Sequence, residues 1–232
     1  MDNPTPSTAD ESSDSEKILK AVAEKLRNCI EQVLRASQEK PRRFVETVEL
    51  QIKLQNYNAR KDKCLRGDIR LPHIPRKKLA VCVIGNKAQC DEAKSHQLSA
   101  VPDEILKGKT KKGQTMKKIV EKYRVFMATE PVIKKIPRNM ANDMDKKGKL
   151  PVVLGEEEPM QAKLEEVRTT VTFRVKAPLI GVPVGNVSMT PEELTENINI
   201  VIKHILATLE QHKLVVRSMH TKSTMGPSQK LY

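Results

Sequence analysis

The chain has 232 residues, of which 42 are Lys or Arg and 29 are Asp or Glu, so its formal net charge is +13. No apolar run approaches the roughly 18 residues of a membrane-spanning helix, and the acidic start lacks the basic and apolar regions of a signal peptide. We therefore expect a cytosolic or nuclear protein with a polyanionic partner, although charge alone is equally consistent with lysines that only solubilise a surface.

The first part of the chain predicts a tail, a helix and two strands. Residues 1–16 are acidic and rich in Pro, Ser and Thr, and they are expected to form a disordered tail. Ser13 has capping-box spacing to a glutamate, and apolar residues then recur at helical intervals, which predicts a helix over about 15–36. Apolar and polar residues alternate strictly over 48–54, which predicts a strand with one buried face, and a second strand is expected near 67–71.

The character of the sequence changes after a proline-containing segment, 72–78, which is expected to act as a hinge. Residues 79–84 form a continuous apolar run, the pattern of a strand covered on both faces, and a helix is expected over about 87–97. The lysine-rich stretch 107–122 predicts a partly buried helix, and another short helix is expected near Pro131. These elements indicate an α/β unit.

The last part of the chain returns to half-buried strands. Alternation over 171–175 predicts one strand, and residues 181–187 predict another. Thr190 then combines an N-cap residue with proline in the first turn and a capping-box glutamate, which predicts a helix with an apolar stripe reaching Leu209. Residues 214–219 are the final expected strand.

The first and last parts therefore resemble two halves of one domain. We expect a discontinuous α+β domain built from residues 17–75 and 159–232, interrupted by an α/β insertion at 76–158.

The segment Thr221–Lys230 carries the clearest binding chemistry. It places hydroxyls, a thioether, a glycine and two lysines on one short stretch with no periodic apolar face. Hydroxyls and backbone amides suit phosphate and 2′-hydroxyl groups, glycine permits close backbone approach, and methionine can lie against a sugar or base. This combination predicts an RNA contact.

Nothing in the sequence predicts a catalytic, metal or cofactor site. The four cysteines show no paired short spacing, and Cys82, inside its apolar strand, is expected to be a buried packing residue. The turn at Gly85 lacks both dinucleotide-binding and phosphate-loop patterns, and the five histidines have no recognisable catalytic partner. We therefore predict a binding protein that is not an enzyme.

Several segments, in the same order, resemble the family of the first universal large-subunit ribosomal protein, which binds the mobile stalk beside the tRNA exit site. They are Arg43–Leu50, Leu71–Arg76, Pro183–Asn186 and Ser223–Gly226. The likeness covers nearly everything after residue 17. Lys222–Gly226, the terminal Leu231 and Tyr232, and Glu49–Ile52 resemble the eukaryotic cytosolic branch, often called L-ten-a.

The resemblance implies an RNA-binding domain formed by both chain ends, with a Rossmann-like three-layer insertion. It also implies a contact set for ribosomal RNA, which is Phe44, Thr47, Glu49, Ser223, Thr224, Met225 and Gly226. Flanking phosphate partners are expected at Arg43, Arg174 and Lys176. Two alternatives stay open, because Phe44 is equally suited to core packing and Glu49 to an exposed strand position.

By resemblance, the chain is expected to be a structural constituent of the large ribosomal subunit that supports release of deacylated tRNA during translation. The implied partners are stalk ribosomal RNA, exit-site tRNA and ribosome assembly factors. The chain is expected to be a monomer within cytoplasmic ribosomes, after nuclear and nucleolar passage during assembly. The alternative is a diverged paralogue that acts as an RNA-binding assembly factor or a translational regulator.

One segment departs from the family pattern. Where the family usually has a Leu-Gly-Pro-Gly-like turn, residues 139–147 contain neither glycine nor proline. We expect a turn of altered geometry there, and a weaker approach to tRNA because of the added acidic groups.

Overall fold

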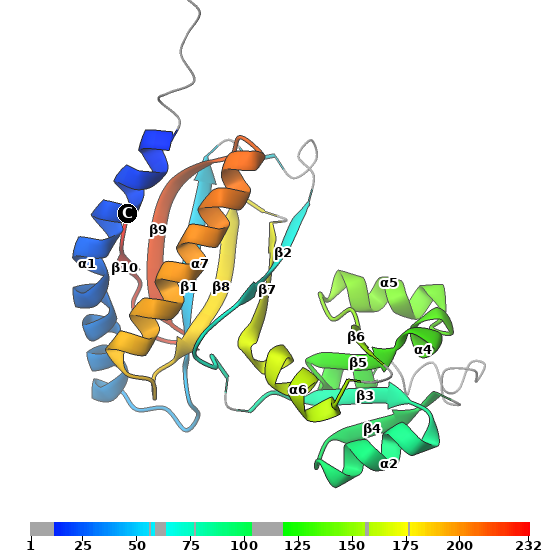
Figure 1. Ribbon diagram of the computed structural model, residues 1–232. Coiled ribbons are helices and arrows are strands. Elements are labelled where there is room, and N and C mark those ends of the chain that lie inside the picture. The colour runs from blue at the N-terminus through cyan, green and yellow to red at the C-terminus, as the bar shows by residue number, and fades with distance from the viewer. Residues whose placement is uncertain are drawn as a thin grey trace, which may run out of the picture. The chain divides into compact units, whose positions relative to one another are not determined.

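The computed structural model describes residues 12–232 apart from 56, 59–63, 77, 104–117, 156–157 and 176. The chain forms two compact units (Figure 1). Unit 1 combines the chain up to Arg76 with Arg168–Tyr232, and unit 2 is Lys77–Val167. The fold is therefore a mixed α/β arrangement in which one unit is contiguous and the other is assembled from both ends of the chain.

The main sheet of unit 1 has four antiparallel strands in the order β10-β9-β1-β8. These strands are β1 (Thr47–Gln55), β8 (Leu179–Asn186), β9 (Val215–Ser223) and β10 (Gln229–Lys230). The strand predicted over 214–219 is longer than expected, since β9 continues through Ser223. The pairing of β1 with β8 is irregular between Val48 and Glu49. Pro183 lies opposite this irregularity on the edge strand β8, where its missing N–H costs no central ladder bond.

Two helices, α1 (Ser12–Glu39) and α7 (Pro191–Gln211), cover one face of this sheet (Figure 1). The predicted start of α7 is confirmed, because Thr190 Oγ1 accepts a hydrogen bond from Glu193 N–H and the Glu193 carboxylate accepts from Thr190 N–H. The predicted start of α1 is wrong. The helix begins before Ser13, so this residue lies inside it and is not its N-cap.

A second, two-stranded antiparallel sheet belongs to unit 1 and consists of β2 (Leu65–Arg70) and β7 (Thr170–Val175). The inward residues of β7 belong to the same apolar core as α1, α7 and β1. On its exposed side, the Thr172 hydroxyl donates to an Asp68 carboxylate oxygen at 2.5 Å. The alternation predicted for this strand is confirmed.

Unit 2 is built on a four-stranded parallel sheet in the order β4-β3-β5-β6. The strands are β3 (Val81–Gly85), β4 (Ser99–Pro102), β5 (Val125–Thr129) and β6 (Val152–Leu154). Alternate residues of β3 and β5 belong to two separate apolar clusters, so both faces of the sheet are buried. Within β3, Cys82 is fully buried in an apolar cluster, which confirms the predicted packing role, and this burial raises the pKa of its thiol to about 12.

The helices of unit 2 are short, and they include α2 (Lys87–Ser95), α4 (Glu130–Lys134) and residues 118–122. The rest of the helix predicted over 107–122 lies outside the described residues. Helix α6 (Met160–Thr169) packs its buried residues against the parallel sheet. This packing extends unit 2 to Val167, whereas the sequence suggested that the insertion ends at 158.

The turn predicted over 139–147 is wrong, because the chain forms helix α5 (Arg138–Lys146) there. With no glycine or proline in this stretch, nothing breaks the helix, and Met144 anchors it in the core. The helix ends at Lys146, and Gly148 follows just beyond the C-cap with a φ of 68°, the left-handed conformation that glycine adopts without strain. Gly148 N–H donates to the Asp145 carbonyl at 2.9 Å.

Candidate nucleic-acid interface

The start of β1 and the loop between β9 and β10 (residues 224–228, the 224–228 loop) are joined directly. Thr47 N–H donates to Thr224 Oγ1 at 3.1 Å, and the Thr224 hydroxyl donates to the Thr47 carbonyl at 3.2 Å. The two residues are 177 positions apart in the sequence. Two of the predicted contact residues therefore form one reciprocal pair that fixes the loop on the strand.

Ser223 and Gly226 shape the loop from inside. Ser223 is fully buried, and its Oγ accepts a hydrogen bond from Gly226 N–H at 3.0 Å. A Cβ atom at Gly226 would collide with Ser223 Oγ, so only glycine fits without displacing that hydroxyl. In this conformation Ser223 presents no surface to a ligand, and its contribution is to hold the loop.

Two large apolar side chains of the predicted contact set are exposed. Phe44 is 54% exposed and Met225 is 59% exposed. The structure therefore excludes core packing for Phe44, which was the open alternative at this position. Exposed aromatic and thioether groups beside a polar loop can pack against sugars and unstacked bases.

Glu49 lies on the face of the main sheet that α1 and α7 do not cover. Val48 and Leu50 are buried toward the helices, so the alternation of the strand turns Glu49 to the other face, where it is half-buried. Its neighbour across the β1–β9 ladder is Lys222. This pairing places a cation beside the carboxylate and continues the polar surface of the 224–228 loop along the sheet.

The three predicted phosphate partners are not all brought together. Arg43 is exposed and adjoins Phe44, next to the joined loop and strand. Arg174 lies on β7 opposite Arg66 of β2, in the two-stranded sheet rather than in the sheet of Thr47. Lys176 lies outside the described residues.

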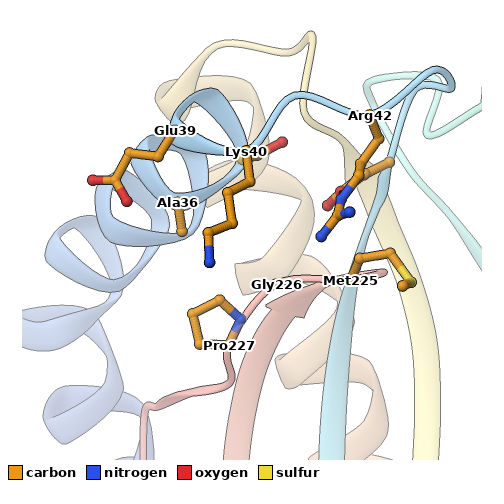
Figure 2. A pocket seen from close by; sticks show the side chains of 9 residues that line it. Ala36, Glu39, Lys40, Arg42, Met225, Gly226 and Pro227 are labelled. Carbon is orange, nitrogen blue, oxygen red and sulfur yellow. The ribbon is translucent and has the colours of Figure 1, made fainter.

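A cavity of about 240 Å³ opens beside the 224–228 loop, at the C-terminal end of α1 (Figure 2). We call it the Arg42 cavity; its lining residues are Ala36, Ser37, Glu39, Lys40, Arg42, Glu46, Met225, Gly226 and Pro227. Sequence reasoning missed Lys40, Arg42 and Glu46. No local pattern indicated them, because residues 40–46 form neither helix nor strand and a spacing of four positions brings side chains together only on a helix.

Other kinds of site find no support in the part of the chain that the structure describes. No group of three or more His, Cys, Asp or Glu side chains there could hold a metal ion. Among the same residues, none of the helices combines the length and the apolar character needed to cross a bilayer.

The joined strand and loop bring hydroxyls, exposed apolar groups and flanking cations together on a mixed α/β fold, which is chemistry that suits an RNA ligand. A family model described as the ribosomal protein L1p/L10e family matches residues 34–227. The chain belongs to this family, and the resemblance found in the sequence is confirmed.

Curated relatives agree across nearly the whole chain. The large ribosomal subunit protein uL1 of Spodoptera frugiperda is 45% identical over 208 residues, which cover 89% of this chain and 96% of that protein. The protein of the same name from Drosophila melanogaster is 43% identical over 201 residues, covering 86% and 93%. That of Caenorhabditis elegans is 42% identical over 214 residues, covering 92% and 99%. The family is structural and non-enzymatic, so the prediction that the chain is not an enzyme is confirmed.

Proposed function

We propose that the protein is a structural constituent of the large ribosomal subunit and that the surface around the Thr47–Thr224 pair binds ribosomal RNA of the mobile stalk. Family membership supports the ribosomal role. The observation that carries the site is the reciprocal hydrogen bonding of Thr47 and Thr224, which unites both ends of the chain in one exposed surface.

The chemistry of this surface divides into two tasks. The cations, Arg43 and Lys222 among them, supply affinity for phosphates that falls as salt rises. Phe44, Met225 and the backbone of the 224–228 loop fit the folded shape of the RNA and its 2′-hydroxyls. The Glu49 carboxylate accepts a hydrogen bond from a 2′-hydroxyl of the RNA or orients Lys222, its cross-strand neighbour.

In this proposal unit 1 is the discontinuous RNA-binding domain and unit 2 is a Rossmann-like insertion. The parallel sheet of unit 2, with apolar clusters on both faces, supports that description. Exit-site tRNA and ribosome assembly factors are further proposed partners, and the protein supports release of deacylated tRNA as a monomer within cytoplasmic ribosomes. Passage through the nucleolus during assembly belongs to the same proposal.

A salt titration tests the RNA site. The full chain is mixed with a stalk-RNA fragment and, separately, with an unrelated hairpin of equal length. Tight binding to the stalk RNA alone that persists near physiological salt is the expected result. Weak binding to both RNAs, lost steeply as salt rises, means that only the positive charge contributes, and it contradicts the proposal.

A double substitution tests the residues. Thr224→Val with Met225→Asp removes the hydroxyl that bonds to Thr47 and places a carboxylate where RNA approaches. Binding to stalk RNA is expected to weaken by about 10- to 100-fold, with the thermal unfolding temperature nearly unchanged because both side chains are exposed. Thr208→Val on α7 is the matched control, since its hydroxyl donates to the His204 carbonyl within the same helix. Unchanged binding by the double variant at physiological salt contradicts the assignment of Thr224 and Met225 to the RNA site.

Cell fractionation separates the ribosomal role from that of a diverged paralogue. Co-sedimentation with mature large subunits is expected, and the names of the curated relatives favour this outcome. Recovery only with precursor particles contradicts it and supports an assembly factor.

A further inference from the structure

We propose that Arg42, held in place by the buried carboxylate of Glu46, binds an RNA backbone phosphate at the mouth of the Arg42 cavity, together with Lys40. This inference rests on the proposed function and deepens it. It adds three residues to the RNA surface that the sequence did not single out, and it gives them different tasks.

Glu46 is placed as an anchor. It is only 2% exposed, and its backbone carbonyl accepts a hydrogen bond from Val187 N–H at 3.1 Å. Its Oε1 lies 3.7 Å from Nε of Arg42, and its Oε2 is buried with no hydrogen-bond partner among the described residues. A carboxylate removed from water in this way depends strongly on the Arg42 cation beside it.

The position of Arg42 suits it to bind an anion. Its side chain is 41% exposed, and the ion pair engages Nε, on the inner edge of the guanidinium. Its terminal nitrogens have no protein partner in the described part of the chain, and Figure 2 shows the guanidinium directed toward Met225. An arginine held at Nε keeps the two-pronged outer edge that matches a phosphate.

The surroundings favour a phosphate over other ligands. Lys40 extends from the end of α1 toward Pro227, while the Glu39 carboxylate is turned away from the cavity (Figure 2). Two cations thus border a space of about 240 Å³ beside the exposed Met225. This is below the roughly 300–1,000 Å³ of pockets for drug-sized ligands and suits one phosphate with part of its sugar.

Whether Glu46→Gln raises or lowers the affinity for RNA distinguishes a carboxylate that anchors Arg42 from one that merely lies near the RNA. If Glu46 were only an anion near RNA, Glu46→Gln would strengthen binding, because it removes a negative charge from the vicinity of phosphates. As an anchor, its charge holds Arg42, so Glu46→Gln weakens binding. The glutamine keeps the backbone hydrogen bond to Val187 and nearly the same shape, which limits the change to the charge.

The experiment compares five variants of the full chain with the native protein, using stalk RNA across a range of salt. Arg42→Gln is expected to weaken binding about tenfold and to reduce the salt slope by about one unit. Arg42→Lys recovers the slope but only part of the affinity, because lysine lacks the planar fork. Glu46→Gln weakens binding about three- to fivefold, and adding it to Arg42→Gln causes little further loss. Arg27→Gln is the charge-matched control at an exposed position of α1, and its binding changes less than twofold.

Thermal unfolding of each variant is measured alongside, so that a loss of binding caused by unfolding is recognised. If the Glu46→Gln variants unfold, Arg42→Gln decides the result alone, because Arg42 is partly exposed and its substitution leaves the fold intact. Two failures are distinguishable. If the native protein does not prefer stalk RNA to the unrelated hairpin, the proposed function fails. If the native protein is selective but Arg42→Gln matches Arg27→Gln, or Glu46→Gln strengthens binding, this inference is overturned while the proposed function stands.

Discussion

The sheets of the two units bury their surfaces differently. In unit 1, α1 and α7 cover one face of the main sheet, and the other face carries half-exposed polar residues such as Thr47, Glu49 and Gln51. In unit 2, apolar clusters occupy both faces of the parallel sheet. A sheet covered twice has no face left for a ligand, whereas one covered once offers a broad polar surface. The half-covered sheet is therefore the one with a free polar face, and the proposed RNA surface lies on it.

The units also differ in how they are assembled. Unit 2 is one continuous segment, but unit 1 joins strands from both ends of the chain. Its candidate site depends on Thr47 and Thr224 meeting across 177 positions. RNA binding should therefore follow the global stability of unit 1 and be insensitive to moderate damage in unit 2.

The largest expected effect comes from the two cores. Ile52 in β1 and Ile84 in β3 are both fully buried, and truncating either to alanine should cost about 2–5 kcal/mol of unfolding free energy in its own unit. Ile52→Ala is expected to weaken binding to stalk RNA on heating well before the native protein loses it. Ile84→Ala is expected to leave binding within about twofold of native at 25 °C. RNA titrations over temperature, with hydrogen exchange to locate the damage, measure both.

Equal loss of RNA binding in these two variants would break the comparison, because it would mean that unit 2 contributes to the site or to the folding of unit 1. Ile200→Ala serves as the control, since Ile200 on α7 is 38% exposed and its truncation removes little buried surface.

A smaller effect is expected at Lys149 in unit 2. Its ammonium donates to the carbonyls of Val120 at 2.6 Å and Tyr123 at 2.8 Å, so it satisfies the end of the helical turn at 118–122. Burial lowers the pKa of Lys149. Lys149→Met should destabilise unit 2 by about 1–3 kcal/mol and leave stalk-RNA affinity unchanged.

Lys146→Met, at an exposed position on α5, is the matched control and should change stability by less than about 0.5 kcal/mol. Denaturant unfolding compares the two variants. If Lys149→Met instead weakens RNA binding while unit 2 keeps its stability, Lys149 is a ligand for the RNA and not a helix cap, and the assignment of binding to unit 1 alone is wrong.

The sequence predicted those elements whose signals are local. The start of α7 was recognisable because Thr190, proline and Glu193 act within a single turn. The alternation of β1 and the continuous apolar run of β3 likewise reported how many faces of each strand are buried. The short strands β4 and β6 were missed, since three or four residues carry too little periodicity to be recognised. The five-residue strand β5 was missed as well, because it closely follows the lysine-rich stretch that was predicted to be helical.

The site was predictable only in part, for a related reason. Family resemblance brought Thr47 and Thr224 together, but nothing in the sequence showed that Ser223 is buried while Met225 is exposed. That distinction arises where β9 ends and the loop leaves the sheet. The Arg42 cavity depends on α1 ending beside the 224–228 loop, which is a tertiary contact that no local pattern reveals.

The prediction with the smallest change in stability concerns the 224–228 loop within the candidate site. Gly226→Ala forces a Cβ atom against Ser223 Oγ and weakens the hydrogen bond from residue 226 N–H that shapes the loop. We expect stalk-RNA affinity to fall about three- to tenfold, with stability changed by about 1 kcal/mol or less, because the loop contributes contacts and little core.

The double variant Gly226→Ala with Ser223→Ala tests the cause of that loss. It removes the hydroxyl that collides with the new methyl group, so a steric cause predicts that affinity partly recovers relative to Gly226→Ala. Ser223→Ala alone should lose a little affinity, since only one internal hydrogen bond disappears. If the double variant binds more weakly than either single variant, with losses that add, the Ser223 hydroxyl and the glycine act independently on the RNA. In that case Ser223 is a direct contact exposed by loop movement, and its buried position is not the bound state.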